Sequence, residues 1–309
     1  MRMRKLGKDE ISVIGYGAWE AGGDAWGPNP SEDEVTGAIR SALDAGITWI
    51  DTAEVYGDGR SEKLVGKAIK GRDGVFVATK LAPSRSGYHA EGVRAGIRGS
   101  MRRLKVDVID LYQLHWPDDR VPLEKTWEMM ARVQDDGLVR HIGLSNYHRQ
   151  DLERCERIRH VDSLQNQLSM LHRADGPELF PWCESIGTAV LAYGPLAYGL
   201  LTGAVTADTE FHPEDWRSGN SDMSYFDELF APEARARHLA KVEERLRPVA
   251  EGLGITLGQL ALAWVVAQPG VTAAIAGSRN PTHIAENAAA GDVELDGATL
   301  ADLERILED

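Results

Sequence analysis

Short runs of apolar and β-branched residues alternate along the chain with longer windows in which apolar residues recur every three or four positions. The short runs predict buried strands, and the windows predict amphipathic helices. Because this alternation is typical of βα units around a parallel sheet, and eight such units close a barrel, the pattern predicts an α/β fold of the (β/α)8 (TIM) barrel type. A doubly wound sheet is the competing architecture. The expected strands are Val13–Gly17, Ile47–Asp51, Val75–Lys80, Val108–His115, His141–Ser145, Ser163–Gln167, Ala189–Tyr193 and Thr272–Gly277.

The first expected helix has clear end signals. Ser31 and Glu34 form a capping box before an apolar face, and Gly46 ends the helix. A second helix is expected to be capped by Ser61 and to end at Gly71. Further helical windows lie near residues 90–104, 123–136, 148–157, 175–186, 234–251, 257–267, 281–290 and 299–307.

Two segments lie outside the repeating units. Residues 203–232, after the seventh strand, have no helical or strand period, and a long aperiodic loop in a compact domain is typically a lid or a binding loop. Before the first barrel strand, Arg2–Lys5 and Glu10–Ser12 predict a small hairpin that closes the barrel floor. No linker or shift in composition divides the chain, so residues 1–309 are expected to form a single domain.

Composition narrows the classes of function. Lys and Arg total 34 and Asp and Glu total 48, which gives a formal net charge of −14. Such a protein is a poor non-specific nucleic-acid binder, and any anionic ligand needs a dedicated local site. Cys155 and Cys183 are too few for a disulfide framework and lack metal-ligand spacing, which fits a reducing compartment, and no metal is expected. The sequence also lacks a signal peptide and a membrane-spanning apolar stretch, so we expect a cytoplasmic protein.

Seven consecutive strand ends offer a charged, hydrogen-bonding or stacking group. The carboxyl ends of barrel strands all face one rim, so these groups are expected to share a pocket. Any one of them alone is more typical of a cap or a satisfied core residue, but the full series predicts a functional site. In chain order they are Asp51, Lys80, His115, Ser145 with Asn146, Gln165, Tyr193, and Gly277-Ser278-Arg279.

Four of the rim residues suit carbonyl reduction. Tyr56 can give a proton to a carbonyl oxygen if a neighbouring ammonium, that of Lys80, stabilises the phenolate. Asp51 would keep Lys80 charged, and His115 would orient the substrate oxygen. The hydride must come from a cofactor, since no side chain supplies one. The same groups also permit a metal site or a Schiff base on Lys80. These residue types alone therefore do not decide between carbonyl reduction and those two alternatives.

A series of motifs then carries a resemblance over essentially the whole chain. In this order, they resemble the aldo-keto reductase family, including its potassium-channel β-subunit-like branch. The resemblance implies the barrel fold and NAD(P)H-dependent reduction of aldehydes or ketones, with a catalytic tetrad of Asp51, Tyr56, Lys80 and His115 in which Tyr56 is the acid. The motifs are Gly15–Trp19, Gly22-Gly23, Trp26-Gly27, Asp51–Gly57, Arg60–Glu62, Ala78–Lys80, Asp110–Pro117, Ile142–Asn146, Gln165, Leu191–Leu196, Gly199–Gly203, Ile275–Pro281 and Glu286-Asn287.

The resemblance also implies a cofactor site. Ser145, Asn146 and Gln165 would hydrogen-bond the nicotinamide carboxamide, and Tyr193 would stack on its ring. The remaining implied cofactor residues are Trp19, Gly194, Leu196, Gly203, Gly277, Ser278, Arg279, His283, Glu286 and Asn287, with backbone near Gly194, Leu196 and Gly203 on the pyrophosphate. Independently of the family, a helix expected to open near Pro281 attracts phosphate to its free N–H groups, and Arg279 adds a donor suited to a 2′-phosphate. NADP(H) is therefore expected, with NAD(H) possible because the preference rests mainly on Arg279.

Aromatic residues are expected to line the substrate pocket. Trp19, Tyr88, Trp116 and Trp216, with Tyr56 and Phe226, follow strand ends or lie in loops, and their walls favour a neutral small-molecule carbonyl. Trp127, Trp182 and Trp264 stand at helical spacing and are assigned to the core.

An NADPH-dependent carbonyl reductase is the leading interpretation. Potassium-channel β-subunits share this fold, so a nucleotide-sensing binding module with little turnover is the alternative from another class. A Schiff-base aldolase acting through Lys80 is the third. No nucleic-acid or membrane partner is expected, and the sequence predicts no particular oligomer.

Overall fold

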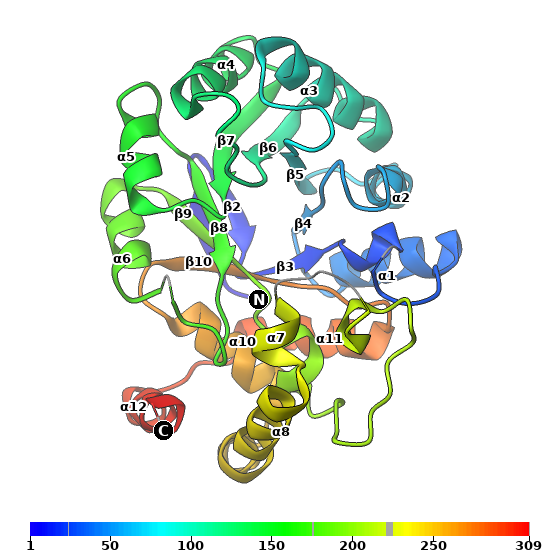
Figure 1. Ribbon diagram of the computed structural model, residues 1–309, viewed down its shortest axis with the longest axis vertical. Helices are drawn as coiled ribbons and strands as arrows, with labels where there is room; N and C mark the ends of the chain where they lie inside the picture. Colours follow the sequence, from blue (N-terminus) through cyan, green and yellow to red (C-terminus); the bar gives the residue numbers. More distant parts are fainter. Residues whose placement is uncertain (24, 175, 221–224, 309) are drawn as a thin grey trace.

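Eight parallel strands close a barrel in the order β10-β3-β4-β5-β6-β7-β8-β9, with helices around it (Figure 1). The computed structural model describes residues 1–23, 25–174, 176–220 and 225–308. All eight predicted strands form, so the barrel is confirmed and the doubly wound sheet is wrong. The strands are β3 (Ile14–Gly17), β4 (Trp49–Asp51), β5 (Phe76–Leu81), β6 (Ile109–Leu114), β7 (Val139–Ser145), β8 (Ser163–Gln167), β9 (Ala189–Tyr193) and β10 (Val271–Ala276).

The helices follow the strands at nearly all the predicted positions. Ser31 caps α1 by accepting a hydrogen bond from the backbone N–H of Glu34 at 3.2 Å, which is the Ser31 half of the predicted capping box. The predicted helix near 234–251 is α8 and α9 joined by a π-helical turn over Val242–Leu246. The helices are α1 (Glu32–Asp44), α2 (Arg60–Ala68), α3 (Ala90–Leu104), α4 (Leu123–Asp135), α5 (Arg149–Glu156), α6 (Gly176–Ile186), α7 (Tyr225–Leu229), α8 (Pro232–Lys241), α9 (Arg247–Leu253), α10 (Leu257–Ala267), α11 (Pro281–Ala289) and α12 (Gly297–Glu308).

The start of α2 corrects one expectation. Ser61 is not its cap, because Gly59 adopts a left-handed conformation (φ 84°) and the helix begins at Arg60. The buried Ser61 hydroxyl instead donates to the carbonyl of Ala18 at 2.7 Å and lies 2.8 Å from the hydroxyl of Thr52. Ser61 therefore ties α2 to the segments that follow β3 and β4.

The predicted N-terminal hairpin closes the bottom of the barrel. Strands β1 (Met3–Leu6) and β2 (Asp9–Ser12) pair antiparallel, and their Leu6 and Ile11 are fully buried. These two side chains pack in one apolar cluster with residues that point inward from the barrel strands, namely Trp49, Phe76, Ala78, Leu111, Ala189, Leu191, Ala273 and Ile275. The floor is therefore filled with side chains.

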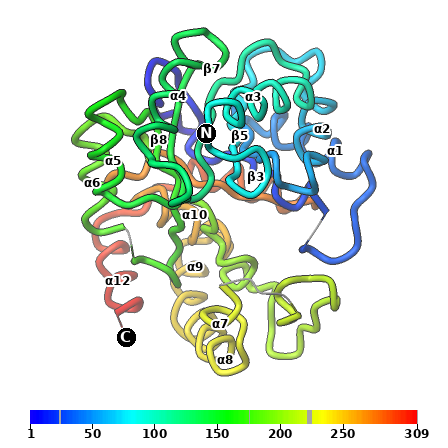
Figure 2. The backbone as a smooth tube through the Cα atoms, turned by 45° about the horizontal axis from the view of Figure 1, so that its top comes forward, coloured from blue at the N-terminus to red at the C-terminus, as the bar shows by residue number. Residues whose placement is uncertain are grey.

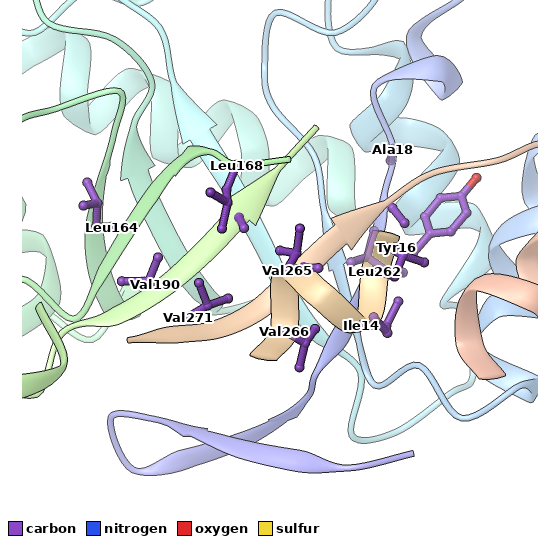
Figure 3. Packing of buried hydrophobic residues seen from close by; sticks show 14 of the residues in the cluster. Ile14, Tyr16, Ala18, Leu164, Leu168, Val190, Leu262, Val265, Val266 and Val271 are labelled. Carbon is purple, nitrogen blue, oxygen red and sulfur yellow. The ribbon is translucent and has the colours of Figure 1, made fainter. Parts of the chain in front are cut away.

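A second, larger apolar cluster lies between the barrel strands and the surrounding helices. Figure 3 shows Leu262, Val265 and Val266 of α10 close to Ile14 of β3 and Val271 of β10. Trp127 and Trp264 are buried in this cluster as predicted, whereas Trp182 is half-buried and stacks under the guanidinium of Arg149. The two clusters hold the strands from both faces.

The strand alternation selects the residues that reach the carboxyl rim. Side chains two residues apart in a strand share a face, so Asp51 follows Trp49 into the barrel, Lys80 follows Ala78, and Tyr193 follows Leu191. In these three strands the last apolar side chain inside the barrel thus lies two residues before the polar side chain at the rim.

The segment 203–232 is more ordered than predicted. Its described residues include a short 3₁₀ helix, Trp216–Ser218, and the single-turn helix α7, while residues 221–224 lie outside the described residues. Asp215 forms an isolated β-bridge with Trp26, and the backbone N–H of Trp216 donates to the carbonyl of Ala25 at 3.0 Å. Figure 2 shows this yellow-green loop beside α7 and α8. The segment is therefore attached to the loop between β3 and α1.

Within the described ranges, no single helix is long and apolar enough to cross a membrane. One bent pair, Pro232–Leu253 with Leu257–Ala267, passes that test together by length and composition only, across a bend of 86°.

Candidate active site

A buried ion pair stands at the centre of the rim. The Lys80 ammonium donates to Asp51 Oδ1 at 2.5 Å and to the carbonyl of Thr52 at 2.8 Å, and its Nζ lies 3.4 Å from the Tyr56 hydroxyl. Lys80 is fully buried, and the Asp51 side chain is 5% exposed. Burial lowers the pKa of Lys80, and the Asp51 carboxylate acts against that shift. The structure thus brings Asp51, Tyr56 and Lys80 together as the sequence predicts.

His115 completes this cluster. Its ring centroid lies 5.7 Å from that of Tyr56, and it stacks on Trp116 at 3.5 Å. Burial holds the pKa of His115 well below its usual value, and the charge of Lys80 adds to that effect. Among the described residues, its Nδ1 has no hydrogen-bond partner. A neutral imidazole carries one N–H donor, so His115 can hydrogen-bond a carbonyl oxygen.

Sequence reasoning did not find the residue that fixes the Tyr56 loop. Glu54, only 1% exposed, accepts hydrogen bonds from the Ala82 N–H at 2.9 Å and the Ser86 hydroxyl at 2.7 Å. Burial raises the pKa of Glu54, and these hydrogen bonds oppose that shift. Because Ala82 follows β5, Glu54 attaches the turn that bears Tyr56 to the strand that bears Lys80. Its only sequence signal is its place between Asp51 and Tyr56.

A cavity of about 890 Å³ opens beside the cluster. This volume is near the upper end of the range for small-molecule and cofactor sites, about 300–1,000 Å³. Asp51, Tyr56, His115 and Trp116 line it, whereas Lys80 lies behind Asp51. Of the predicted cofactor residues, the cavity wall contains Trp19, Ser145, Asn146, Gln165, Tyr193, Gly194, Leu196, Gly277, Ser278, Arg279, His283, Glu286 and Asn287.

Besides Lys80, four residues predicted for the site lie outside this wall. Tyr88 is buried, donates its hydroxyl to the Trp116 carbonyl at 2.7 Å, and borders a separate pocket of about 240 Å³. Trp216 is 1% exposed, because it packs edge-on against Trp26 and Phe230. Gly203 is not part of the wall, although its neighbours Thr202 and Ala204 line the cavity, as does Arg247, which a Cβ on Gly203 would meet. Phe226, expected in the pocket, packs against Gly219 and is also absent from the described wall.

The polar residues of the rim form a connected network. Gln165 donates its amide N–H to Asp51 Oδ2 at 2.8 Å, Asn146 donates to the carbonyl of His115 at 2.9 Å, and the Tyr193 hydroxyl donates to Asn146 Oδ1 at 2.7 Å. Asn146 adopts a left-handed conformation (φ 65°), which turns its amide toward both partners. Residues predicted for the nicotinamide therefore also hold the predicted tetrad in place.

Further cavity residues were not predicted. Tyr198, which has a positive φ of 54°, lines the cavity and stacks on Tyr225 with centroids 5.4 Å apart. Glu20, directly after Trp19, lines the cavity and forms an ion pair with Arg279 at 3.5 Å. Trp26 and Ala25 complete that side. Their positions depend on loop conformations, for which hydrophobic periodicity gives no signal.

The cavity has features that fit a dinucleotide. Gly277 and Gly17 bring the backbones of neighbouring strands so close that a Cβ on Gly277 would lie 2.4 Å from the Gly17 carbonyl oxygen. Helix α11 then begins at Pro281, and Asn280 caps it through the Thr282 N–H. A helix N-terminus beside Arg279 favours a phosphate group. No group of three or more His, Cys, Asp or Glu side chains among the described residues is placed to hold a metal ion.

Fold and site together define a (β/α)8-barrel protein with an Asp, Tyr, Lys and His cluster beside a cavity of about 890 Å³. The chain belongs to the aldo/keto reductase family, whose model matches residues 13–308. It is 36% identical over 284 residues to the aldo-keto reductase YhdN of Bacillus subtilis, covering 89% of this chain and 83% of that protein. It is also 30% identical over 317 residues to a probable voltage-gated potassium channel subunit beta of Oryza sativa, covering 95% and 92%.

Solved structures agree with this assignment. The glycerol dehydrogenase AKR11B4 from Gluconobacter oxydans superposes with a TM-score of 0.87 at 30% identity, over 99% of this chain and 94% of that one. An aldo/keto reductase from Klebsiella pneumoniae in complex with NADP and acetate gives a TM-score of 0.74 at 31% identity, over 97% and 93%. These findings confirm the family resemblance that the motifs carry.

Proposed function

We propose that the protein reduces an aldehyde or ketone to an alcohol with NADPH, and that Tyr56 is the general acid. The observation that carries the proposal is the approach of the Lys80 ammonium to within 3.4 Å of the Tyr56 hydroxyl, at the wall of the 890 Å³ cavity. The NADP-bound relative from Klebsiella pneumoniae supports the choice of cofactor.

The residues that would hold the cofactor divide between the two ends of the dinucleotide. Ser145, Asn146 and Gln165 offer amide and hydroxyl groups to a carboxamide, and Tyr193 offers a ring face. At the other end, Arg279 offers a guanidinium to a 2′-phosphate. His283, Glu286 and Asn287 would surround the adenosine, and the backbone of Gly194, Leu196 and Gly277 would approach the pyrophosphate. When bound, the nicotinamide supplies the hydride.

The protein's own contribution is the proton and its control. Tyr56 gives its proton to the carbonyl oxygen, and the adjacent Lys80 ammonium stabilises the phenolate that remains. Asp51 keeps that ammonium in place at 2.5 Å. Neutral His115 donates a hydrogen bond to the same oxygen and fixes its direction. General acid catalysis of this kind contributes about 10²–10⁴-fold to the rate.

The nearby aromatic side chains bear on the substrate. Trp19 and Tyr56 have ring centroids 6.3 Å apart, and Trp116 is 39% exposed beside His115. Walls of this kind bury apolar surface, and the Asp51 carboxylate beside them is already paired with Lys80. A neutral, apolar carbonyl compound is therefore the substrate class we propose.

The contacts of Lys80 argue against the Schiff-base alternative. A lysine nucleophile must reach the substrate as a free amine. Lys80 is fully buried, lies outside the cavity wall, and donates to both Asp51 and the Thr52 carbonyl. Borohydride with a carbonyl compound and no nicotinamide is expected to trap nothing on Lys80.

The nucleotide-sensing alternative has one observation in its favour, namely the similarity to a probable potassium channel subunit beta. An enzyme and a sensor would both bind NADPH, but only the enzyme would oxidise it at a useful rate with generic aldehydes such as a nitrobenzaldehyde. Binding without turnover across an aldehyde panel would favour the sensor and contradict the reductase.

The decisive variant is Tyr56→Phe. We expect it to bind NADPH as the unmodified protein does, measured by quenching of tryptophan fluorescence, and to lose about 10²–10⁴-fold in turnover. Tyr112→Phe is the matched control, because Tyr112 is a buried tyrosine of β6 outside the cavity wall. Unchanged turnover in Tyr56→Phe would remove Tyr56 as the acid.

A further inference from the structure

An acidic side chain faces the arginine that the proposed function assigns to the 2′-phosphate. Glu20 begins a 3₁₀ helix over Glu20–Gly22, in the loop after β3, and Arg279 lies in the loop after β10. These strands are neighbours in the barrel (Figure 1). Glu20 Oε2 lies 3.5 Å from Arg279 Nε, and both side chains line the cavity.

Other charges act on Glu20 from the surrounding elements. Arg217 and Asp215 come from the 203–232 segment, and His283 comes from α11. Burial raises the pKa of Glu20, and the charge of Arg279 opposes this most strongly. Arg217 is already engaged, because it donates to both carboxylate oxygens of Asp215. Arg279 is thus the cation that Glu20 contacts directly among the described residues.

The pair affects the two nicotinamide dinucleotides in opposite ways. A 2′-phosphate that binds the Arg279 guanidinium would either share it with the Glu20 carboxylate or displace that carboxylate. In both cases it would lie beside a like charge, which costs repulsion. A ribose that ends in a 2′-hydroxyl meets no such repulsion, and its O–H can donate to a carboxylate. Acidic residues hold the 2′-hydroxyl of NAD, and arginines accommodate the 2′-phosphate of NADP, in other dinucleotide sites.

We propose that Glu20 is the specificity-determining residue for the nucleotide: it competes with the 2′-phosphate for Arg279, weakens NADPH binding, and lets NADH compete. The inference rests on the proposed function, because it takes the cavity as the dinucleotide site. Both partners are partly exposed, the side chain of Glu20 by 25% and that of Arg279 by 31%, so the pair can open without unfolding the loops.

Binding of small fragments tests the inference without any turnover. We would titrate the protein with 2′,5′-ADP and 5′-AMP by calorimetry, since these differ only in the 2′-phosphate, and with NADPH and NADH by fluorescence quenching. Glu20→Gln keeps the shape and removes the charge. We expect it to lower the Kd of 2′,5′-ADP and NADPH at least fivefold, and to leave the Kd of 5′-AMP and NADH unchanged or raised.

A double variant tests whether Glu20 acts on 2′-phosphate binding through Arg279. In an Arg279→Gln background, Glu20→Gln is expected to change the Kd of 2′,5′-ADP by less than twofold, because the contested guanidinium is gone. Glu20→Ala is expected to act like Glu20→Gln. Glu10→Gln is the matched control, an exposed glutamate of β2 at the barrel floor.

Each contrary result has a distinct meaning. Weaker binding of 2′,5′-ADP by Glu20→Gln would show that Glu20 only positions Arg279, and an equal gain without Arg279 would show that the pair is irrelevant. Either result overturns the inference and leaves the proposed function standing. If the unmodified protein binds neither NADPH nor NADH, the proposed function fails, and the inference fails with it.

Discussion

The amide of Gln165 donates to Asp51 at 2.8 Å, on the second carboxylate oxygen of the residue whose first oxygen holds Lys80. Asp51 is therefore held from both sides, by an ammonium from β5 and an amide from β8. A residue predicted for the cofactor thus also positions the buried ion pair, so substitutions at the rim affect stability and binding together.

The first prediction concerns the loss of the Gln165 amide. Gln165→Met should cost about 1–3 kcal/mol of stability, because it leaves a buried carboxylate oxygen without its donor. NADPH binding should weaken as well, because the carboxamide partner is lost. Urea denaturation and fluorescence titration measure the two effects. A variant with unchanged stability would show that the hydrogen bond to Asp51 does not hold the pair.

The second prediction concerns the ion pair itself. Lys80→Met should destabilise the protein by about 3–5 kcal/mol, since it leaves Asp51 buried without its cation. The double variant Asp51→Asn, Lys80→Met should be more stable than Lys80→Met, because no unpaired charge remains. Chemical denaturation of the two variants provides the comparison. Equal loss in both would mean that packing of the lysine chain, and not charge, sets the cost.

The third prediction is a pH dependence at the barrel floor. His141 Nε2 lies 2.7 Å from Asp9 of the hairpin, and Nδ1 lies 3.5 Å from Asp162. Burial lowers the pKa of His141, but the two carboxylates outweigh it and the net pKa is raised. The stabilisation is therefore complete below the unfolded-state pKa of about 6.5, and it is lost as the pH rises through the higher folded-state pKa.

This dependence can be measured as the urea midpoint between pH 5 and pH 9. The unmodified protein should lose stability over that range by more than His141→Gln does, because the glutamine cannot be protonated. Asp9→Asn should reduce the difference between pH 5 and pH 9 by removing one carboxylate. Parallel curves for the unmodified protein and His141→Gln would contradict the prediction.

The fourth prediction uses the close approach of β3 and β10. Gly277→Ala would put a Cβ 2.4 Å from the Gly17 carbonyl oxygen, where no flexible side chain can give way. We expect a loss of about 1–3 kcal/mol and weaker NADPH binding. Gly252→Ala is the control, because Gly252 in α9 has no atom within 4 Å of the added Cβ, and alanine favours a helix by about 0.5–1 kcal/mol.

The fifth prediction concerns the substrate alone. Trp116 is 39% exposed and stacks on His115 at 3.5 Å, so it offers an apolar surface beside the proposed oxygen site. Trp116→Ala should raise the KM for aromatic aldehydes about tenfold while the Kd of NADPH stays within twofold. An unchanged KM would place the substrate elsewhere in the cavity.

Much of the barrel follows from the sequence, because strand formation there depends on local apolar runs. The alternation of side chains also predicts that Asp51 and Lys80 share the inside of the rim. Ser61 illustrates a failure of the same reasoning: Gly59 can adopt φ 84°, and the helix begins before the cap that the sequence signals. The local sequence pattern does not show whether the helix begins after Gly59 or after Ser61.

Loop residues were the least predictable part of the site. Tyr88 and Trp216 share with Trp19 the signal of an aromatic residue after a strand or in a loop, yet they are buried outside the cavity. Glu20 lies outside every motif, and Glu54 lies within Asp51–Gly57 but was given no role there. The contacts of both arise only when separate loops meet at the rim. Such contacts depend on the whole fold and are absent from any short window of sequence.

The filled floor of the barrel has a consequence for the side from which a proton can reach Tyr56. Leu6 and Ile11 of the hairpin pack with Trp49 and Phe76 in one apolar cluster, which closes this end of the barrel. If Tyr56 is the acid, as we propose, its proton is then replaced from the carboxyl rim, where the cavity opens beside it. Loops around that opening can change without disturbing the floor, which the hairpin closes with apolar side chains.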